Sequence, residues 1–430
     1  MRQQREIPAG LWDRQYAKFS LYGFLKNLRF FDPYLILFFL EKDITFLQIG
    51  FLFSIREVTI YILEIPSGII ADTWGRKKSM IVSFVSYIIS FVIFTFSGSY
   101  ILFAAAMVFF AGGEAFRTGT HKAMMFEYLR LRDMDTYRVE YYGRTHAWAQ
   151  RGAALSALIA GSIVFFSGSF QTVFLFSIIP YCLNLLLMVS YPRELDGAGR
   201  QQEDMSVKSR TWEIMKEHVS GLASMITVKR TRRSLLNFSF FDGVFKAAKD
   251  YIQPVIQQFA LAAPVLLVLS GEERTAVIAA VVYAVLYLIS SWTSERAGRL
   301  VTWYGSHERA LNRTFAASCA VVLLTGIFLE VSLAGIAVLI FIGYYALHSI
   351  RRPVAVGYLS MQIKNSMMAT GLSGESQFRT LITAVLAPLF GWCADSFGIS
   401  WSLIVFSILL SIFALLFRIA PQPERFAADS

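Results

Sequence analysis

Twelve long apolar stretches divide this chain, and each is long enough to cross a lipid bilayer. A hydrocarbon core of about 30 Å requires roughly 20 consecutive apolar residues in a helix. Of the 430 residues, 55% are hydrophobic and only 16% are charged, which excludes a soluble globular protein of this length. Lipid offers no hydrogen-bond partners, so each stretch is expected to be helical. We predict an all-α membrane protein with transmembrane helices over residues 15–40, 45–70, 79–97, 100–118, 143–166, 170–191, 235–259, 275–293, 311–328, 333–350, 377–395 and 400–418.

Basic residues are distributed unequally between the two sets of predicted loops. Only Lys42 and Arg274 fall in loops that follow odd-numbered spans, whereas the other loop bases fall in the termini and after even-numbered spans. Basic residues are retained on the cytoplasmic side of a membrane. The pattern predicts a multi-pass protein of the cytoplasmic (inner) membrane with both termini in the cytoplasm. The net charge of +10 mostly reflects this asymmetry, so we expect no nucleic-acid partner.

The chain changes character between its sixth and seventh apolar stretches. Polar and charged residues replace the apolar run over residues 193–232. This segment is the expected boundary between one six-helix bundle at 1–192 and a second at 233–430. Within it, apolar residues such as Trp212 and Met215 recur at roughly helical spacing. The spacing predicts an amphipathic helix on the cytoplasmic membrane surface.

A short motif after the second span recurs in blurred form after the eighth. In both copies an acid is followed three residues later by Gly-Arg, in a polar loop between two apolar stretches. Duplication is the simplest explanation, and duplicated membrane proteins are mostly transporters. The residues that define the copies are Gly68, Asp72, Gly75, Arg76 and Lys77 in the first and Glu295, Gly298 and Arg299 in the second.

Four basic residues form a second repeat, inside the first and seventh spans. In each span a glycine is followed by a base after three and after six residues, so the two bases share one helix face. A cation at the centre of a membrane helix costs on the order of 2.5–3.5 kcal/mol, so such side chains line a cavity or pair with a carboxylate. The four bases are Lys26, Arg29, Lys246 and Lys249.

A purely structural explanation of these bases stays open. Lys26 and Lys249 could extend to a membrane interface, or pair with Asp32 and Asp250 respectively. Asp250 directly follows Lys249 in the chain, so on a helix it is expected to point in a different direction.

Three carboxylates inside the predicted spans are candidates for coupling transport to protons. Coupling requires an acid that can be neutral in one conformational state. The candidates are Asp32 in the first span, Glu57 in the second and Glu114 in the fourth. Arg56 is adjacent to Glu57, and Arg117 can pair with Glu114 on one helix face. Both bases therefore serve either a structural ion pair or a contact with the substrate.

The twelve spans and the loop motif together resemble the major facilitator superfamily. In that family the loop between helices 2 and 3 reads Gly-x-x-x-Asp-Arg-x-Gly-Arg-Arg/Lys, and the first copy of our motif matches it except that Thr73 replaces the usual Arg. The resemblance implies two pseudo-symmetric six-helix bundles with a latch that joins them when the cytoplasmic side is shut. Asp72 would then face the eleventh span near Gln377, and Glu295 would face the fifth span near Gly143. The alternative is that the bases of the motif are topology signals only.

The same resemblance implies a substrate site between the first and seventh spans, because several organic-phosphate and organic-anion carriers of this superfamily place a base on each. We therefore predict a secondary active transporter that moves a small organic anion by alternating access, coupled to protons or another ion, or by exchange. The alternative is a proton-coupled exporter of drugs or amphiphiles, favoured by the 38 Phe and 19 Tyr. Neither uptake nor export is favoured. The predicted substrate ligands are Lys26, Arg29, Arg56, Arg117, Lys246 and Lys249.

Sequence motifs of the common enzyme classes are absent. The chain contains no Gly-x-x-x-x-Gly-Lys-Ser/Thr run of an ATP-driven pump, and no His-Glu-x-x-His or Gly-x-Ser-x-Gly run of a hydrolase. Its 3 cysteines show no metal-ligand spacing. We expect no catalytic residue, no metal and no cofactor, and a chain that works as a monomer.

Overall fold

The structure is a computed structural model that describes residues 12–196, 216, 227–362 and 368–420. Every regular element in these residues is helical, and no strand occurs among them. Nine helices of this part are long and apolar enough to cross a membrane, which confirms the all-α membrane class. The count of twelve spans stays a prediction, and the predicted amphipathic helix around Trp212 lies outside the described residues.

Apart from the first, the predicted spans of the amino-terminal half each correspond closely to one helix. One additional helix, α6, comes between the fourth and fifth spans. In chain order the elements are α1 (Arg14–Lys26), α2 (Leu35–Glu41), α3 (Phe46–Trp74), α4 (Arg76–Phe96), α5 (Tyr100–Arg117), α6 (Thr120–Arg130), η1 (Asp135–Tyr137), α7 (Arg138–Ser167), α8 (Thr172–Val189) and η2 (Arg193–Asp196).

The carboxy-terminal half repeats this plan. Its last helix covers both the eleventh and twelfth predicted spans, and Gly398, with a φ of 86°, breaks the helix between them. The elements are α10 (Lys229–Ala248), η3 (Lys249–Tyr251), α11 (Ile252–Ala262), α12 (Gly271–Glu295), α13 (Ala297–Tyr304), α14 (His307–Glu330), α15 (Ala334–Gln362) and α16 (Met368–Leu416).

The first and seventh predicted spans are broken, so the expectation of one continuous helix in each was wrong. An irregular segment at 27–34 separates α1 from α2, and the 3₁₀ turn η3 separates α10 from α11. Gln253 of α11 is fully buried, donates to the Asp32 carbonyl oxygen over 2.8 Å and accepts from the Ile36 N–H over 2.7 Å. In a continuous helix these backbone groups would pair with each other. Where the helix is broken in a dry interior they need another partner, and the side-chain amide of Gln253 provides it.

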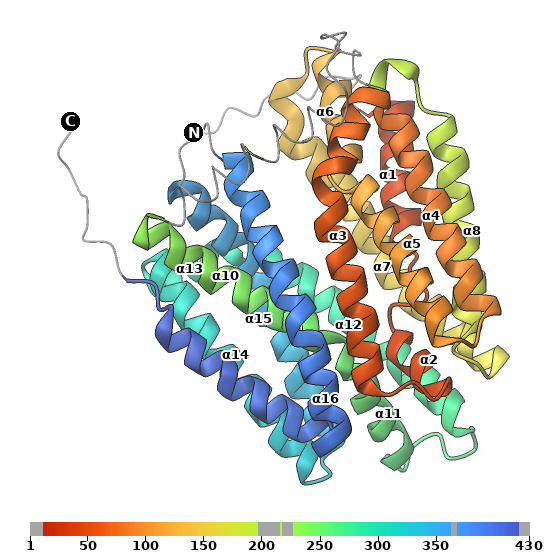
Figure 1. The fold of residues 1–430 in the computed structure, drawn as a ribbon, viewed down its shortest axis with the longest axis vertical. Coiled ribbons are helices and arrows are strands. Elements are labelled where there is room, and N and C mark those ends of the chain that lie inside the picture. Colours follow the sequence, from red (N-terminus) through yellow and green to blue (C-terminus); the bar gives the residue numbers. More distant parts are fainter. Residues whose placement is uncertain (1–11, 197–215, 217–226, 363–367, 421–430) are drawn as a thin grey trace.

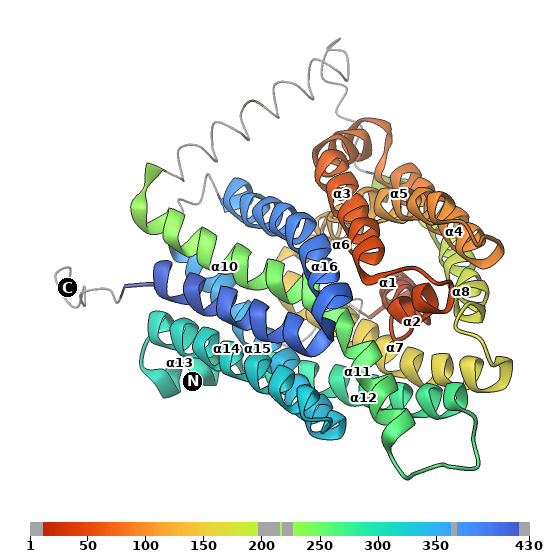
Figure 2. The same ribbon diagram turned by 60° about the horizontal axis from the view of Figure 1, so that its bottom comes forward.

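The two halves meet along α3 with α16 and along α7 with α12. At one end α2 and α11 also lie together (Figures 1 and 2). We call this the outer end, which carries the connections at 42–45 and 263–270. The opposite end, which carries α6 and α13, is the inner end (Figure 1).

Glycine permits the closest approaches of the two halves at the outer end. A Cβ atom at Gly391 would lie 2.1 Å from the backbone oxygen of Phe46, and one at Gly50 would lie 2.5 Å from that of Ala387. The carboxylate of Asp395 accepts hydrogen bonds of 2.9 and 2.8 Å from the N–H groups of the first two residues of α3. These N–H groups have no partner inside the helix, so Asp395 caps it. The outer end is therefore closed.

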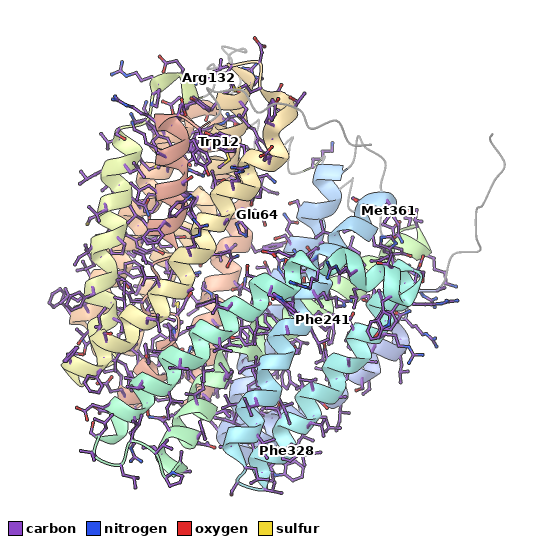
Figure 3. All side chains as sticks on the ribbon, turned by 180° about the vertical axis from the view of Figure 1, so that it is seen from behind. Trp12, Glu64, Arg132, Phe241, Phe328 and Met361 are labelled. Carbon is purple, nitrogen blue, oxygen red and sulfur yellow. The ribbon has the colours of Figure 1, made fainter. Side chains whose placement is uncertain are left out.

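The inner end is open. A cleft of about 810 Å³ lies between the halves and is lined by α7, α12 and α15, with Gly143, Glu295 and His348 among its residues. Figure 3 shows the space between the halves from behind, with Glu64 of α3 at its edge. One closed end and one open end are the arrangement expected of a duplicated bundle whose halves rock against each other.

Candidate functional site

A central cavity of about 200 Å³ lies between the two halves. Apolar side chains, all from the amino-terminal half, form one part of its lining, and ionisable side chains from both halves form the rest. The apolar residues are Phe31, Leu35, Ile60, Phe91, Phe94, Met107, Phe110 and Phe174. The ionisable residues are Arg29, Asp32, Arg56, Glu57, Glu114, Lys246, Lys249 and Asp250.

Glu57 joins the two halves inside this cavity. Its carboxylate is 0% exposed and lies 2.5 Å from the ammonium of Lys246 on α10 and 3.1 Å from the guanidinium of Arg56 on α3. The Arg56 guanidinium also lies over the Phe53 ring at 4.8 Å. Two cations therefore share one carboxylate, and the group of three carries a net positive charge.

The other predicted bases of the cavity also have acidic partners. Arg29 lies 3.4 Å from Asp32, and Lys249 lies 2.5 Å from Asp250. The expectation that Asp250 points away from Lys249 was wrong, because both residues lie in the 3₁₀ turn η3 rather than in a regular α-helix. Lys26 does not pair with Asp32, since Arg29 takes that position.

Lys26 and Arg117 line a different cavity. This second cavity encloses about 340 Å³ within the amino-terminal half. Arg117 pairs with Glu114 and donates to the Tyr87 hydroxyl over 3.2 Å. The six bases predicted as ligands are thus divided between two sites, with Arg29, Arg56, Lys246 and Lys249 in the central cavity and Lys26 and Arg117 in the second.

The three predicted coupling acids, Asp32, Glu57 and Glu114, all line the central cavity, and each has a basic partner. The sequence reasoning missed Glu64, one carboxylate oxygen of which is buried with no hydrogen-bond partner among the described residues. Glu64 follows Glu57 by two helical turns and so lies on the same face of α3. That spacing was visible in the sequence.

The first copy of the loop motif makes contacts within its own half. Arg76 lies 3.8 Å from Asp72 and 4.0 Å from Glu127 of α6, while the Asp72 side chain is 61% exposed. Among the described residues, Asp72 forms no ion pair across the halves. No described atom lies within 4 Å of a Cβ position at Gly68, so no neighbouring helix packs closely against this glycine in this conformation.

Asp196 of η2 lies beside the N-terminus of α4. The sequence alone did not indicate this residue. Its carboxylate accepts from the Lys77 N–H over 2.5 Å, and a Cβ atom at Gly75 would lie 2.9 Å from it. Gly75 also has a φ of 106°, a conformation that favours glycine. The Lys77 ammonium donates to the backbone oxygens of Val189 and Tyr191 over 2.6 and 2.8 Å. The motif therefore ties α4 to the end of α8.

A comparison with models of known protein families agrees with the duplicated halves and the charged cavity between them. The family model of the Major Facilitator Superfamily matches residues 22–376. The chain belongs to the Major Facilitator Superfamily. This facilitator is therefore a multi-pass membrane transporter with a small-molecule substrate, and it is not an enzyme.

Known structures with the fold of this facilitator include other transporters. The nucleoside transporter NupG superposes with a TM-score of 0.73 at 11% identity, over 94% of this chain and 98% of that one. A POT family transporter in complex with 5-aminolevulinic acid gives 0.70 at 13% identity, over 94% and 95%. At such low sequence identities, the similarity shows only that the fold is shared. The uncharacterized MFS-type transporter YxaM of Bacillus subtilis is 44% identical over 54 residues, which span only 13% of this chain and 14% of YxaM.

The second copy of the motif in this facilitator faces the open cleft. Glu295 and Gly143, which the latch would bring together, both line the cleft at the inner end. Glu295 and Arg299 are exposed, and no atom lies within 4 Å of a Cβ position at Gly298. The latch stays a prediction for the conformation in which the inner end is closed.

Proposed function

We propose that this facilitator moves a small organic anion across the cytoplasmic membrane by alternating access, and that the anion binds in the central cavity. The cavity lies between the halves, at the position from which rocking can expose it to either end. Its ionisable residues come from both halves, with Arg56 and Glu57 on α3 and Lys246 and Lys249 near the break between α10 and α11. A bound solute therefore contacts both halves at once.

The observation that carries this proposal is the shared carboxylate of Glu57. Lys246 and Arg56 each approach it, at 2.5 and 3.1 Å. An anionic group that enters between the two cations replaces or joins Glu57 as their partner, whereas a cation would meet two positive charges. The phenylalanine side chains in the cavity lining favour a solute that also has an apolar part.

Uptake of labelled solutes into liposomes that contain the purified protein tests this proposal. From a panel of carboxylates and sugar phosphates, we expect at least one solute to be taken up about tenfold faster than by protein-free liposomes. Cations of the same size should show no such increase. A protein that moves cationic or neutral drugs and none of the anions would be the exporter of the alternative hypothesis.

We further propose that transport is coupled to protons through Glu64. Protonating Asp32, Glu57 or Glu114 breaks an ion pair, whereas one oxygen of Glu64 is buried without a hydrogen-bond partner in the described part of the chain. A carboxylate that is buried without a cation at hydrogen-bond distance gains most from taking up a proton. Glu64 also lies at the edge of the space between the halves (Figure 3), where a change of conformation alters its surroundings.

Replacing Glu64 with Gln should therefore uncouple transport from the proton gradient. Accumulation of solute driven by a pH gradient should fall about tenfold or more, while exchange of labelled for unlabelled solute continues at a rate close to that of the wild type. Glu64→Asp is the matched control and should retain gradient-driven accumulation in part. Equal accumulation by Glu64→Gln and the wild type would exclude Glu64 as the coupling acid.

We also propose that the chain works as a monomer with its inner end toward the cytoplasm. The central cavity is built within one chain. Of the described residues, α6 and α13 at the inner end carry Lys122, Arg130 and Arg299, and retention of positive charge on the cytoplasmic side would put this end in the cytoplasm.

A further inference from the structure

We propose that the second cavity is a binding site for a small oxyanion, such as phosphate or a carboxylate, separate from the central cavity. It encloses about 340 Å³ between α1, α5, α6 and α7. Its lining contains the cations Lys26, Arg117 and Lys122 and two histidines, His121 and His146, but no Asp or Glu of the described residues. This distinguishes it from the central cavity, where acids and bases are present in equal number.

Two of the three cations lack an acidic partner. The ion pairs formed within the described ranges include neither Lys26 nor Lys122. The Lys122 ammonium lies instead over the Tyr142 ring at 5.0 Å. Lys122 is exposed, but Lys26 is half-buried. A cation that is partly withdrawn from water without a counter-charge is unfavourable, and a bound anion removes that cost at Lys26.

The third cation separates the two cavities. Arg117 lines the second cavity, while its partner Glu114 lines the central one. The Arg117 charge is therefore partly neutralised from the central side, and its remaining donors are available to a ligand on the other side.

The start of α6 contributes backbone donors to the same cavity. Gly119 precedes the helix with a φ of 82°, no side chain caps the helix there, and Thr118 and Gly119 both line the cavity. The first N–H groups of a helix have no internal partner and favour anions. This feature alone would not define a site, but here it coincides with the unpaired cations.

Tyr22 supplies an independent indication of a missing ligand. Its side chain lines the cavity and the residue is 5% exposed. Arg117 lies near enough to interact with its hydroxyl, yet the hydroxyl has no partner that meets hydrogen-bond geometry among the described residues. Buried hydroxyl groups are normally paired. An oxyanion in the cavity would accept from this hydroxyl as well as from the cations.

The site is accessible from the open end of the molecule. His146 lines both the second cavity and the cleft at the inner end. A free oxyanion on the cytoplasmic side, or the phosphate of an anionic lipid headgroup, can therefore reach it. Because neither Lys246 nor Glu57 lines the second cavity, we expect the site to bind an oxyanion without these two residues.

Thermal unfolding of the purified full chain in neutral detergent, titrated with inorganic phosphate, tests this proposal. Phosphate should raise the Tm of the wild type, because a ligand that binds the folded state stabilises it. Lys26→Gln and Lys122→Gln should each require about tenfold more phosphate for the same increase. Lys18→Gln is the matched control, because Lys18 lies on the same helix as Lys26 but donates to the Ser190 carbonyl oxygen over 2.7 Å, outside the cavity. Lys246→Gln tests the central cavity.

The outcomes separate this site from the transport site. Retained phosphate responses in Lys18→Gln and Lys246→Gln, with weakened responses in Lys26→Gln and Lys122→Gln, support the proposal even if no transported anion is found. A response lost only in Lys246→Gln, or no response of the wild type to phosphate, sulfate or acetate, overturns it. Repeating the titration in phosphatidylcholine nanodiscs with and without phosphatidylglycerol identifies the source, since a lipid headgroup that occupies the site should abolish the phosphate response.

Discussion

Replacing Lys246 with Ala should reduce transport of the anionic solute by about 100-fold while the protein still folds. The Lys246 ammonium lies 2.5 Å from Glu57 and is the link from the carboxy-terminal half to the shared carboxylate. Its removal takes one of the two cations from the proposed anion site. Glu57 keeps Arg56 as a partner at 3.1 Å, so no buried carboxylate is left alone. Initial rates in liposomes and the Tm of the purified variant measure the two effects separately.

The double variant Lys246→Ala/Glu57→Gln distinguishes binding from structure. If Lys246 serves only to neutralise Glu57, removing both charges should restore transport. If Lys246 binds the anion, the double variant should stay inactive, and Lys246→Arg should keep part of the activity because the positive charge remains. Transport at the wild-type rate by Lys246→Ala would refute a role of this residue in binding.

Replacing Gly391 with Ala should abolish transport by preventing closure of the outer end. The added Cβ atom would lie 2.1 Å from the backbone oxygen of Phe46, and a helix backbone cannot yield as a flexible side chain can. The variant should therefore populate a conformation in which the outer end is open. Labelling of single cysteines at each end by a membrane-impermeant thiol reagent, after replacement of Cys182, Cys319 and Cys393, measures which end is accessible.

Two other glycines provide matched comparisons for Gly391→Ala. Gly98→Ala should have no effect, because no atom lies within 4 Å of a Cβ position there. Gly68→Ala also meets nothing in this conformation, but it should hinder closure of the inner end if the predicted latch forms, and so shift accessibility in the opposite direction. Wild-type transport by Gly391→Ala would show that the observed close approach is not part of the transport cycle.

The positions of most helices could be predicted because the bilayer imposes both their length and their apolar composition. The span predicted at 45–70 is α3 (Phe46–Trp74), for example. The breaks in the first and seventh spans could not be predicted in this way. At the break in the first span, the side chain of Gln253 pairs with the backbone at Asp32, 221 positions away in the chain. Hydropathy carries no information about such a contact.

Some charged residues of the candidate site could be predicted from the sequence. A charge inside an apolar span is energetically costly, so a charged residue found there is expected to have a role. That rule found Lys246 and Glu57, but it did not show that they form one pair, because they are 189 positions apart. It also grouped Lys26 with the central cavity, from which the structure separates it. Asp395 and Asp196 were missed because nothing in the sequence around them indicates a special role. Each accepts hydrogen bonds from a helix N-terminus that only the folded structure places beside it.

The negative charge of the transported solute is the central claim, and competition between matched compounds tests it most directly. Once a transported carboxylate has been found in the liposome panel, its uptake is measured in the presence of the unlabelled carboxylate and, separately, of its uncharged amide. The two compounds have nearly the same shape and differ in charge. We predict that the carboxylate competes at least about tenfold more strongly than the amide, as expected for a group held by two cations. Equal competition by the amide would contradict the account.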